Sequence, residues 1–302
     1  DGLYIDRFAT SIIVRVDVND PSEESRKVNL MRAMATKLFE TNDKNIKRVY
    51  GYCARSHRGS LSDIEKTPFA SPTLLHPTTA SDEVIHFEGI ENGIPFDLTY
   101  GGSKFSTGLY IDQRDLRAYM KLNRGGGRRL LNLFSHANSI SIAAHQGTSK
   151  FATTNIDIDK SYMDLSERLL PIPPNDNIVG DAVVWVNKLA KRGEIYDVVV
   201  IDPPSTATMG KGRKKKRFTV KNDFSDLVYH SASMIREGGG EIIAVTNFRK
   251  MSMATFHTLV LDAITRAGRR GFLKYWVAPG EDFAHERTTD EKFVKTLIIT
   301  VV

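Results

Sequence analysis

The sequence predicts an α/β fold, in which a doubly wound sheet of seven strands and intervening helices follows a small α+β domain. After about residue 105, short apolar runs alternate with helical patterns, and the run Asp197–Ile201 (DVVVI) is almost entirely apolar. Such a run is typical of the centre of a parallel sheet. Before residue 105, Val84–Ile90 and Ile94–Tyr100 flank Glu91-Asn92-Gly93, a turn sequence that favours a tight hairpin.

The first domain, residues 1–104, is expected to mix strands with one helix. The β-branched run Ser11–Val16 predicts a strand, and Val49–Ala54 predicts another. The apolar spacing of Glu24–Glu40 predicts a helix between them. Several prolines in Ser60–Ser81 indicate a long irregular connection. Gly101-Gly102 marks the expected boundary to the second domain, residues 105–302.

The second domain is expected to alternate strands and helices. The predicted strands are Arg129–Phe134, Phe151–Asp157, Asn177–Gly180, Asp197–Ile201, Glu241–Val245, Gly271–Val277 and Val294–Val302. The predicted helices are Ser139–Gln146, Ser161–Leu169, Ala182–Lys191, Asp223–Arg236 and Ala254–Ala267. Ligands of such sheets bind beyond the carboxyl ends of the strands, so the residues at those ends are the candidate site.

The composition excludes several classes of protein. The chain is 41% hydrophobic and 26% charged, as globular proteins are, and its apolar runs are too short to span a bilayer, so we expect no membrane partner. The single cysteine, Cys53, excludes a disulfide framework and a cysteine-based zinc site, and no histidine spacing fits a metal motif. We therefore expect no metal and an intracellular, reducing compartment, either the cytoplasm or the mitochondrial matrix.

The net charge of +6 comes from one segment. Lys211–Arg217 (KGRKKKR) holds six basic residues, and the other 36 basic residues balance the 36 acidic ones. Glycines and repelling like charges indicate a flexible loop. The segment is either a solvated or nuclear-localisation-like stretch or a phosphate-binding arm, because clustered cations release counterions from nucleic acids. The candidate RNA-binding residues are Lys211, Arg213, Lys214, Lys215, Lys216 and Arg217, with Arg249 and Lys250 after a neighbouring strand.

Polar residues follow four of the predicted strands. Asn132–Ser135 ends the first, Asp157 ends the second, Asp181 follows the third, and Asp202-Pro203-Pro204 follows the fourth. A carboxylate at such a position can accept hydrogen bonds from ribose hydroxyls. The two prolines give a rigid edge against which a flat base could be held. Taken singly, Asp157 and Asp181 are better explained as N-caps of the helices that follow, and only together with Asp202 and the strand order do they favour a binding site.

A dinucleotide-dependent oxidoreductase is the main competitor for this architecture, and the sequence disfavours it. Such an enzyme needs a G-x-G-x-x-G turn after its first strand, so that backbone amides can approach the pyrophosphate. The corresponding residues here, Phe134–Ser139 (FSHANS), contain no glycine, and the chain has no P-loop pattern.

Four motifs carry a resemblance to a known family. They are TGLYIDQR at Thr107–Arg114, LNLFS at Leu131–Ser135, IDPP at Ile201–Pro204 and TNFRK at Thr246–Lys250. In these motifs and their order the chain resembles the guanine-N7 half of the bacterial bifunctional large-subunit ribosomal RNA methyltransferase. That half is a Rossmann-like class I methyltransferase domain that uses S-adenosylmethionine.

The resemblance implies S-adenosylmethionine as the cofactor and ribosomal RNA, free or in a preribosomal particle, as the partner. It implies cofactor-binding roles for Asp112, Arg114, Asn132, Phe134, Ser135, Asp157, Ile158, Asp181 and Ala182. It also implies that the substrate motif, Asp202, Pro203 and Pro204, forms the catalytic end of the site.

The chain departs from the family at two turns, so two functions stay open. His136-Ala137-Asn138 stands where the family has Tyr-Thr-Gly, although asparagine can replace glycine in a left-handed conformation. Gln146-Gly147-Thr148 stands where the family has paired glycines. One function is methyl transfer to a guanine ring nitrogen, which needs no general base. The other is a catalytically degenerate RNA-binding protein, either a ribosome assembly factor or a component of an organellar ribosome. Methylation of cytosine carbon 5 needs a thiolate, which Cys53 in the first domain is not expected to supply.

Overall fold

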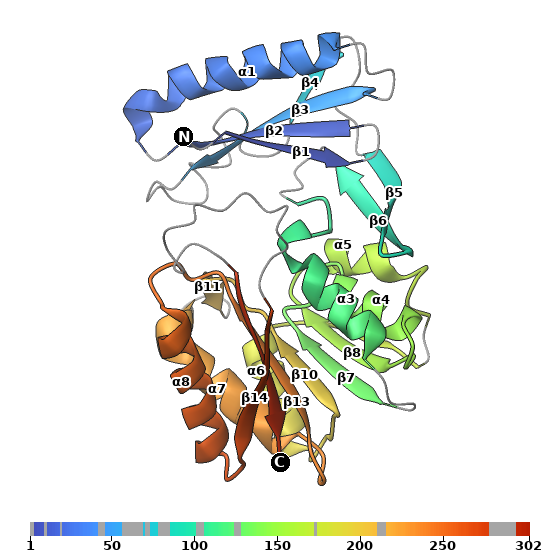
Figure 1. Ribbon diagram of the computed structural model, residues 1–302, viewed down its shortest axis with the longest axis vertical. Helices are drawn as coiled ribbons and strands as arrows, with labels where there is room; N and C mark the ends of the chain where they lie inside the picture. The colour runs from blue at the N-terminus through green and yellow to red at the C-terminus, as the bar shows by residue number, and fades with distance from the viewer. Residues whose placement is uncertain are drawn as a thin grey trace. The chain divides into compact units, whose positions relative to one another are not determined.

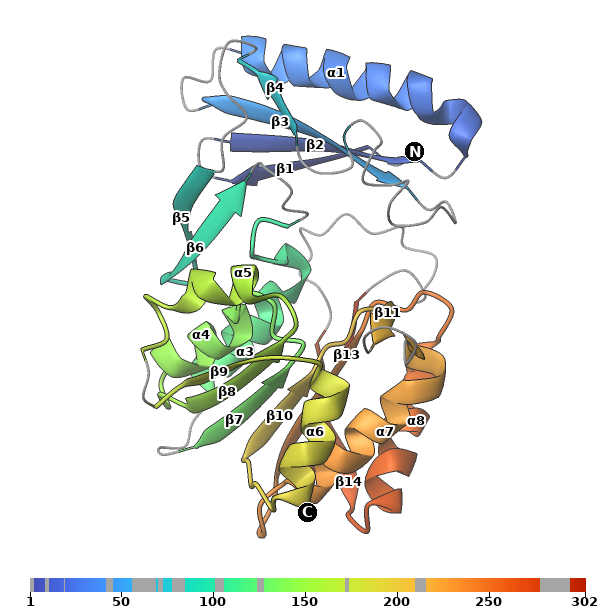
Figure 2. The same cartoon turned by 180° about the vertical axis from the view of Figure 1, so that it is seen from behind.

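The computed structural model, drawn in Figures 1 and 2, describes most of the chain. The described residues are 3–8, 11–18, 20–41, 46–55, 69, 73–77, 85–100, 106–123, 128–171, 174–209, 216–277 and 294–302. The chain divides into two compact units, Asp1–Ile90 with Asp97–Thr107, and Glu91–Phe96 with Gly108–Val302. The boundary expected at Gly101-Gly102 lies outside the described residues. Within the described ranges, no helix has the length and apolarity to cross a membrane.

The described part of the first unit contains a four-stranded sheet with one helix packed on it. Its strands, in sheet order, are β1 (Leu3–Phe8), β2 (Ser11–Val18), β3 (Arg48–Arg55) and β4 (Thr73–His76). β2 and β3 are parallel because α1 (Glu24–Glu40) forms the crossover between them. Met31 and Ala35 of α1 pack on the buried strand residues Val14 and Val16.

The first unit corrects the prediction of an irregular connection. The segment Ser60–Ser81 is not irregular throughout, because Thr73–His76 forms β4 and pairs antiparallel with β3. A four-residue strand at the edge of a sheet tolerates a proline directly after it, here Pro77. Apart from Phe69 and residues 73–77, that segment lies outside the described residues. The hairpin prediction is confirmed, since β5 (Ile85–Glu91) pairs with β6 (Ile94–Tyr100) around Asn92 and Gly93, whose φ angles are 52° and 73°.

The described part of the second unit is built on a seven-stranded sheet, which confirms the predicted fold class. The strands are β7 (Arg129–Leu133), β8 (Ala152–Asp157), β9 (Asp176–Val179), β10 (Val198–Ile201), β13 (Gly240–Thr246), β14 (Gly271–Val277) and β15 (Lys295–Val301). Their order is β14-β15-β13-β10-β7-β8-β9, and only β15 runs antiparallel to its neighbours.

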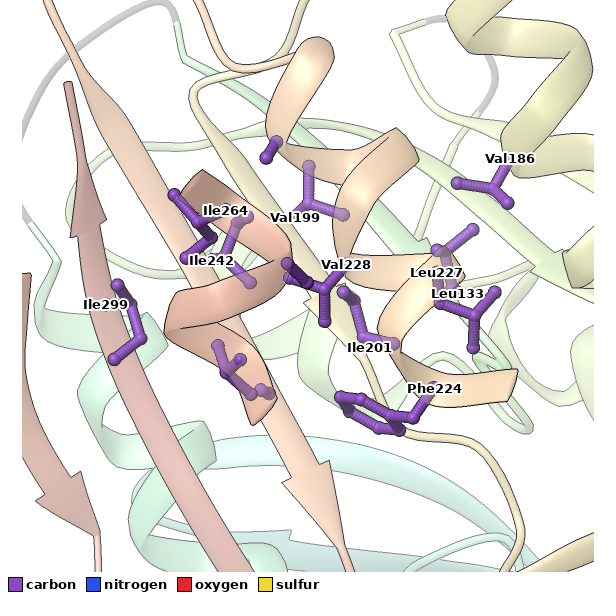
Figure 3. Close-up of a cluster of buried hydrophobic side chains, with 14 of the residues drawn as sticks. Leu133, Val186, Val199, Ile201, Phe224, Leu227, Val228, Ile242, Ile264 and Ile299 are labelled. Atoms are coloured by element: carbon purple, nitrogen blue, oxygen red, sulfur yellow. The ribbon is translucent and has the colours of Figure 1, made fainter. Parts of the chain in front are cut away.

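Helices lie on both faces of this sheet (Figures 1 and 2). On one face α3 (Arg114–Leu122) contacts α4 (Ser139–Gln146), which packs on β7 and β8. On the other face are α6 (Ala182–Lys191), α7 (Val220–Ser233) and α8 (Met253–Arg266). Figure 3 shows how Phe224, Leu227 and Val228 of α7 meet Val199 and Ile201 of β10. These side chains form the main core and hold β10 at the centre of the sheet.

The helix predicted over Ser161–Leu169 is wrong in its length. α5 (Lys160–Met163) ends early and continues as a single 3-10 turn, Asp164–Ser166. The buried hydroxyl of Ser166 donates to the carbonyl of Met163 at 2.7 Å, so a side chain occupies an acceptor that a continuing helix would use.

The basic segment is partly a hairpin and not wholly a loop. β11 (Thr206–Met209) pairs antiparallel with β12 (Lys216–Thr219), so Lys216 and Arg217 lie in a strand. Threonine and phenylalanine in these runs favour strand pairing. Lys211, Arg213, Lys214 and Lys215 lie outside the described residues.

A buried ion pair joins the hairpin turn to α3 inside the second unit. Arg117, which is 1% exposed, places two guanidinium nitrogens 2.7 Å from the two carboxylate oxygens of Glu91. Its third nitrogen donates to the carbonyl of Tyr110 at 2.8 Å. Next to this pair, the ammonium of Lys121 donates to the carbonyl of Asn92. Arg117 therefore fixes the backbone that leads into the TGLYIDQR motif.

Replacing Arg117 with methionine should strongly destabilise the protein. The variant leaves the Glu91 carboxylate buried without its partner, a change that costs about 3–5 kcal/mol. Urea denaturation measures the loss. Lys160→Ala breaks an exposed pair with Asp164 and should leave the denaturation midpoint almost unchanged. Equal midpoints for both variants would show that the buried pair does not hold the hairpin turn in place.

Candidate functional site

A cavity of about 330 Å³ lies at the carboxyl ends of β7, β8, β9 and β10. Its volume falls in the range of small-molecule sites. The structure brings together most of the residues that the sequence proposed for the site. Those that line the cavity are Asp112, Asn132, Phe134, Ser135, Asp157, Ile158, Asp181, Ala182, Asp202, Pro203 and Pro204.

Other lining residues received no role from the sequence. They are Tyr110, Gln113, His136, Ser139, Ile140, Gly180, Asn247 and Val294. Gln113 could have been found, because it follows Asp112 directly in the TGLYIDQR motif. Val294 had no local signal, since only the pairing of β15 with β13 brings the start of β15 to this edge of the sheet.

The turn after β7 is built from left-handed residues. Phe134, His136 and Asn138 have φ angles of 60°, 49° and 57°, and the backbone N–H of Asn138 donates to the carbonyl of Ser135 at 2.7 Å. The expectation that asparagine takes the left-handed conformation here is confirmed. The Asn138 amide donates to Ser166 at 2.7 Å and to Asn177 at 3.1 Å. These bonds hold the side chain in the protein interior and keep it out of the cavity.

Asp157 is held by backbone amides at the end of β8. One carboxylate oxygen accepts from the N–H of His136 at 2.8 Å, and the other accepts from the N–H of Asp159 at 2.9 Å. Each oxygen has a second lone pair for a further hydroxyl group. Burial raises the pKa of Asp157, while these amides lower it. The N-cap of α5 is Asp159, which accepts from Ser161, so the interpretation of Asp157 as a cap is wrong.

Asp181 has both roles that the sequence left open. It is the N-cap of α6, because its carboxylate accepts from the N–H of Val183 at 3.0 Å. It also lines the cavity beside Gly180 and Ala182. The same carboxylate thus starts the helix and presents a polar group to a ligand.

Two further carboxyl groups that line the cavity, those of Asp112 and Asp202, influence each other electrostatically. The amide of Gln113 donates to the carboxylate of Asp202 at 2.5 Å. Burial raises the pKa of Asp202 to about 7, the bond from Gln113 lowers it, and the nearby carboxylate of Asp112 raises it further. Burial also raises the pKa of Asp112, an effect that the guanidinium of Arg117 opposes. This part of the cavity is therefore suited to a group that carries positive charge.

The remaining predicted residues lie elsewhere. Arg114 is outside the cavity lining, with its guanidinium 3.9 Å from the carboxylate of Asp115. Arg249 and Lys250 are exposed, two and three residues beyond the lining residue Asn247. The side chains of Lys216 and Arg217 are outside the described part of the structure. Among the described residues, no group of three or more His, Cys, Asp or Glu side chains could hold a metal ion.

Comparisons with known proteins agree with this geometry. Residues 78–254 match the family model of S-adenosylmethionine-dependent methyltransferases. The doubly wound sheet, with a cavity beyond the carboxyl ends of its strands, is the arrangement in which such sheets bind ligands. The chain belongs to the S-adenosylmethionine-dependent methyltransferase family.

Curated relatives carry ribosomal RNA methyltransferase names. The chain is 28% identical over 187 residues to YwbD of Bacillus subtilis, named as a ribosomal RNA large subunit methyltransferase, covering 60% of this chain and 45% of YwbD. It is 31% identical over 151 residues to ribosomal RNA large subunit methyltransferase K/L of Ectopseudomonas mendocina, covering 49% and 20%. It is 24% identical over 276 residues to ribosomal RNA large subunit methyltransferase I of Aeromonas salmonicida, covering 89% and 63%. The chain thus spans less than half the length of the first two.

Solved structures share the fold over the whole chain. One is a protein of Streptococcus mutans described as an S-adenosylmethionine-dependent methyltransferase, with a TM-score of 0.77, 22% identity, and coverage of 99% of this chain and 71% of that chain. A second, solved as a complex with S-adenosylhomocysteine, has a TM-score of 0.79, 22% identity and the same coverage of 99% and 71%. Trm5b from Pyrococcus abyssi has a TM-score of 0.62 at 14% identity, with coverage of 99% and 74%.

The residues around the cavity fit the cofactor of the family. Within the described structure, the buried hydroxyl of Ser135 lines the cavity without a hydrogen-bond partner, and a buried polar group of this kind is normally satisfied by a ligand or water. Asp157 offers acceptors for a ribose, and Phe134, Ile158 and Ala182 offer apolar contacts.

Replacing Asp202 with asparagine should raise the melting temperature more at pH 8 than at pH 5. In the unfolded chain an Asp carboxyl ionises near ~3.9, whereas the folded pKa of Asp202 is about 7. Between these values the folded state holds a proton that the unfolded chain releases, so stability falls as the pH rises. Asparagine carries no charge and escapes this loss. Calorimetry at both pH values measures the difference in melting temperature between the variant and the wild type. The exposed Asp164→Asn variant is the control. If the melting temperatures of the variant and the wild type differ by the same amount at both pH values, the Asp202 carboxyl is not buried as described.

Proposed function

We propose that this chain transfers the methyl group of S-adenosylmethionine to nitrogen 7 of a guanine in ribosomal RNA. The observation that carries the proposal is the acceptor end of the cavity, where Asp202 accepts from Gln113 and lies near Asp112. The ribosomal substrate is taken from the names of the relatives. A ribosomal substrate, free or in a preribosomal particle, implies the cytoplasm or the mitochondrial matrix as the compartment.

The acceptor end suits a nucleophile that needs no deprotonation. Nitrogen 7 of guanine attacks with a ring lone pair, and the methylated ring is left with a positive charge. Burial raises the pKa of Asp112 and of Asp202, so a positive charge that develops on the base favours the ionised form of both carboxyls. In that form the two carboxylates stabilise the transition state. Pro203 and Pro204 form a rigid edge that fixes the plane of the base and aligns the nucleophile.

The other lining residues would hold the cofactor. When bound, S-adenosylmethionine supplies a methyl group activated by its sulfonium. Asp157 would bind the ribose hydroxyls, and Asp181 would lie toward the adenine, since both carboxylates line the cavity at the ends of neighbouring strands. Asn132 also lines the cavity, and its buried amide donates to the hydroxyl of Ser141 at 2.9 Å, which fixes the end of β7 on α4.

Cytosine carbon 5 is a poor target for this site. Its methylation requires a cysteine thiolate that bonds to the ring. The chain has one cysteine, and Cys53 is buried in the core of the first unit among residues of α1, β2 and β3. The residues that line the cavity belong to the second unit.

The alternative is an RNA-binding protein without turnover. Its support is the altered turn, in which His136-Ala137-Asn138 replaces the family pattern. Asn138 adopts the left-handed backbone that a glycine would provide, and its amide bonds to Ser166 and Asn177 keep its side chain out of the cavity. We therefore favour catalytic methyl transfer. RNA binding without catalysis is one of the possible outcomes of the experiment.

The experiment combines cofactor binding with identification of the methylated nucleoside. Calorimetry should show that S-adenosylmethionine binds, and Asp157→Ala should weaken binding about 10- to 100-fold because it removes two charge-assisted hydrogen bonds. Asp164→Ala, at an exposed position after α5, is the matched control. Nucleoside mass spectrometry of unmodified large-subunit RNA incubated with enzyme and cofactor should reveal 7-methylguanosine. No binding at millimolar cofactor contradicts turnover, and 5-methylcytidine contradicts the position.

The basic segment should contribute to RNA affinity by binding phosphates. β11 begins two residues after Pro204, so the hairpin that carries the segment starts at the acceptor end of the site. Replacing Lys214, Lys215 and Lys216 with alanine should weaken RNA binding. It should also lower the slope of log affinity against log salt by about 0.7–0.9 for each phosphate that is no longer bound. Titrations at several salt concentrations measure the slope. Replacing the exposed Lys160, Lys188 and Lys191 controls for net charge, and an unchanged slope in the first variant would leave the segment a solvated loop.

A further inference from the structure

Strand β14 is an edge of the seven-stranded sheet and exposes four large apolar side chains. Phe272, Leu273, Tyr275 and Trp276 are 54%, 48%, 54% and 53% exposed. Large apolar side chains that are exposed together mark interaction surfaces. We call Phe272, Tyr275 and Trp276 the aromatic edge.

The aromatic edge presents rings on both faces of the sheet. Phe272 and Tyr275 lie opposite Thr300 and Ile298 of β15, while Trp276 lies opposite Leu297. Successive residues of a strand point to opposite faces, so Tyr275 and Trp276 flank the edge from two sides. Tyr275 is already steadied by Tyr119, whose ring meets it edge to face at 5.9 Å.

A bulge keeps another strand from pairing with this edge. The register shifts between Leu273 and Tyr275 and leaves Lys274 as the extra residue. The ammonium of Lys274 lies 2.7 Å from the carboxylate of Glu241 and 3.2 Å from the hydroxyl of Tyr119. A bulge and an edge lysine are the features that block strand addition. The side chains, and not the backbone, are therefore the binding element.

Basic residues lie before the aromatic edge in the chain and after strand β13, two strands away in the sheet. Arg269 and Arg270 precede β14, and the guanidinium of Arg269 is held at 2.8 and 3.1 Å by the carbonyls of Ile235 and Arg236, which fix it without cancelling its charge. At the carboxyl end of β13, the exposed Arg249 and Lys250 follow the cavity residue Asn247. This arrangement favours an anionic partner.

The strand directions bring the aromatic edge to the side of the sheet where the cavity lies. β14 and β13 are both antiparallel to β15 and so run in the same direction. Through β15, Trp276 is level with Ala244, near the carboxyl end of β13. Within the described residues, Val294 at the start of β15 lines the cavity, and Trp276 pairs with Leu297 of the same strand, so the aromatic edge and the cavity share strand β15.

We propose that the aromatic edge is a stacking platform for unpaired nucleotides that flank the methylated base of the RNA substrate. The inference rests on the RNA substrate proposed above. Aromatic side chains stack on any base, and neighbouring cations hold the phosphates, so the combination binds single-stranded RNA with little regard to sequence. A second copy of the chain fits less well, because four half-exposed side chains offer roughly 400 Å² where a stable interface needs about 800 Å² per partner.

Tryptophan fluorescence tests the platform without reference to methyl transfer. The chain contains two tryptophans, Trp185 and Trp276. In the Trp185→Phe variant, a short single-stranded RNA oligonucleotide should quench the emission of Trp276, whereas the matched Trp276→Phe variant should show no quenching. If Trp185→Phe does not fold, the difference between the wild type and Trp276→Phe gives the same readout.

The affinity for the oligonucleotide is the second readout. Trp276→Ala should lose about tenfold in affinity, and Trp276→Phe should retain most of it because phenylalanine still stacks. Quenching that is absent, or equal in the two single-tryptophan variants, overturns the proposal. The proposal is also overturned if Trp276→Ala leaves the RNA affinity unchanged and, in sedimentation, converts a dimer of the wild type to a monomer. Formation of 7-methylguanosine without quenching overturns the platform alone, whereas quenching without methylation supports the platform and overturns the proposed function.

Discussion

The burial of β10 between β7 and β13 is the constraint on which the rest of the second unit depends. The parallel register pairs Ile201 with Leu133 on one side and with Ala244 on the other. The chain segments that follow these strands therefore leave the sheet at the same edge. Because α6, α7 and α8 bury one face of these strands (Figure 3), the edge is rigid. The cavity forms at this edge, because the polar residues that directly follow the apolar strands lie outside the core.

Forming the site costs stability that the core must offset. Three residues of the turn after β7 hold left-handed φ angles, and each such residue outside glycine costs of order 1–3 kcal/mol. Burial raises the pKa values of Asp112, Asp157 and Asp202 together, which means that their charged forms are less stable in the folded state. Strain and buried charge concentrated at one edge of an otherwise apolar sheet are typical of functional sites, where activity is retained at the expense of stability.

Helices and strands were predicted correctly where neighbouring residues in the sequence determine them. Glu24–Glu40, Ser139–Gln146 and Ala182–Lys191 form helices with the expected bounds, because apolar spacing and terminal polar residues decide them within a few turns. The prediction of a helix over Ser161–Leu169 was wrong because the hydroxyl of Ser166 donates a hydrogen bond to the backbone carbonyl of Met163. The strands β4 and β11 were missed because short strands gain stability only from their partners. Propensity alone does not identify those partners.

The sequence by itself determined the fold class, the strand-end carboxylates and the absence of a second thiol, since periodicity and composition are local properties. Tertiary structure alone decided which side chains meet. Gln113 and Asp202 are 89 residues apart, yet they share a hydrogen bond. The amide of Asn138 turns inward to Ser166 and Asn177 and away from the ligand. The order of the strands leaves β14 at the edge, so Tyr275 and Trp276 are exposed where the same residues in a central strand would be core. Strand order depends on packing between distant segments, and no local pattern encodes it.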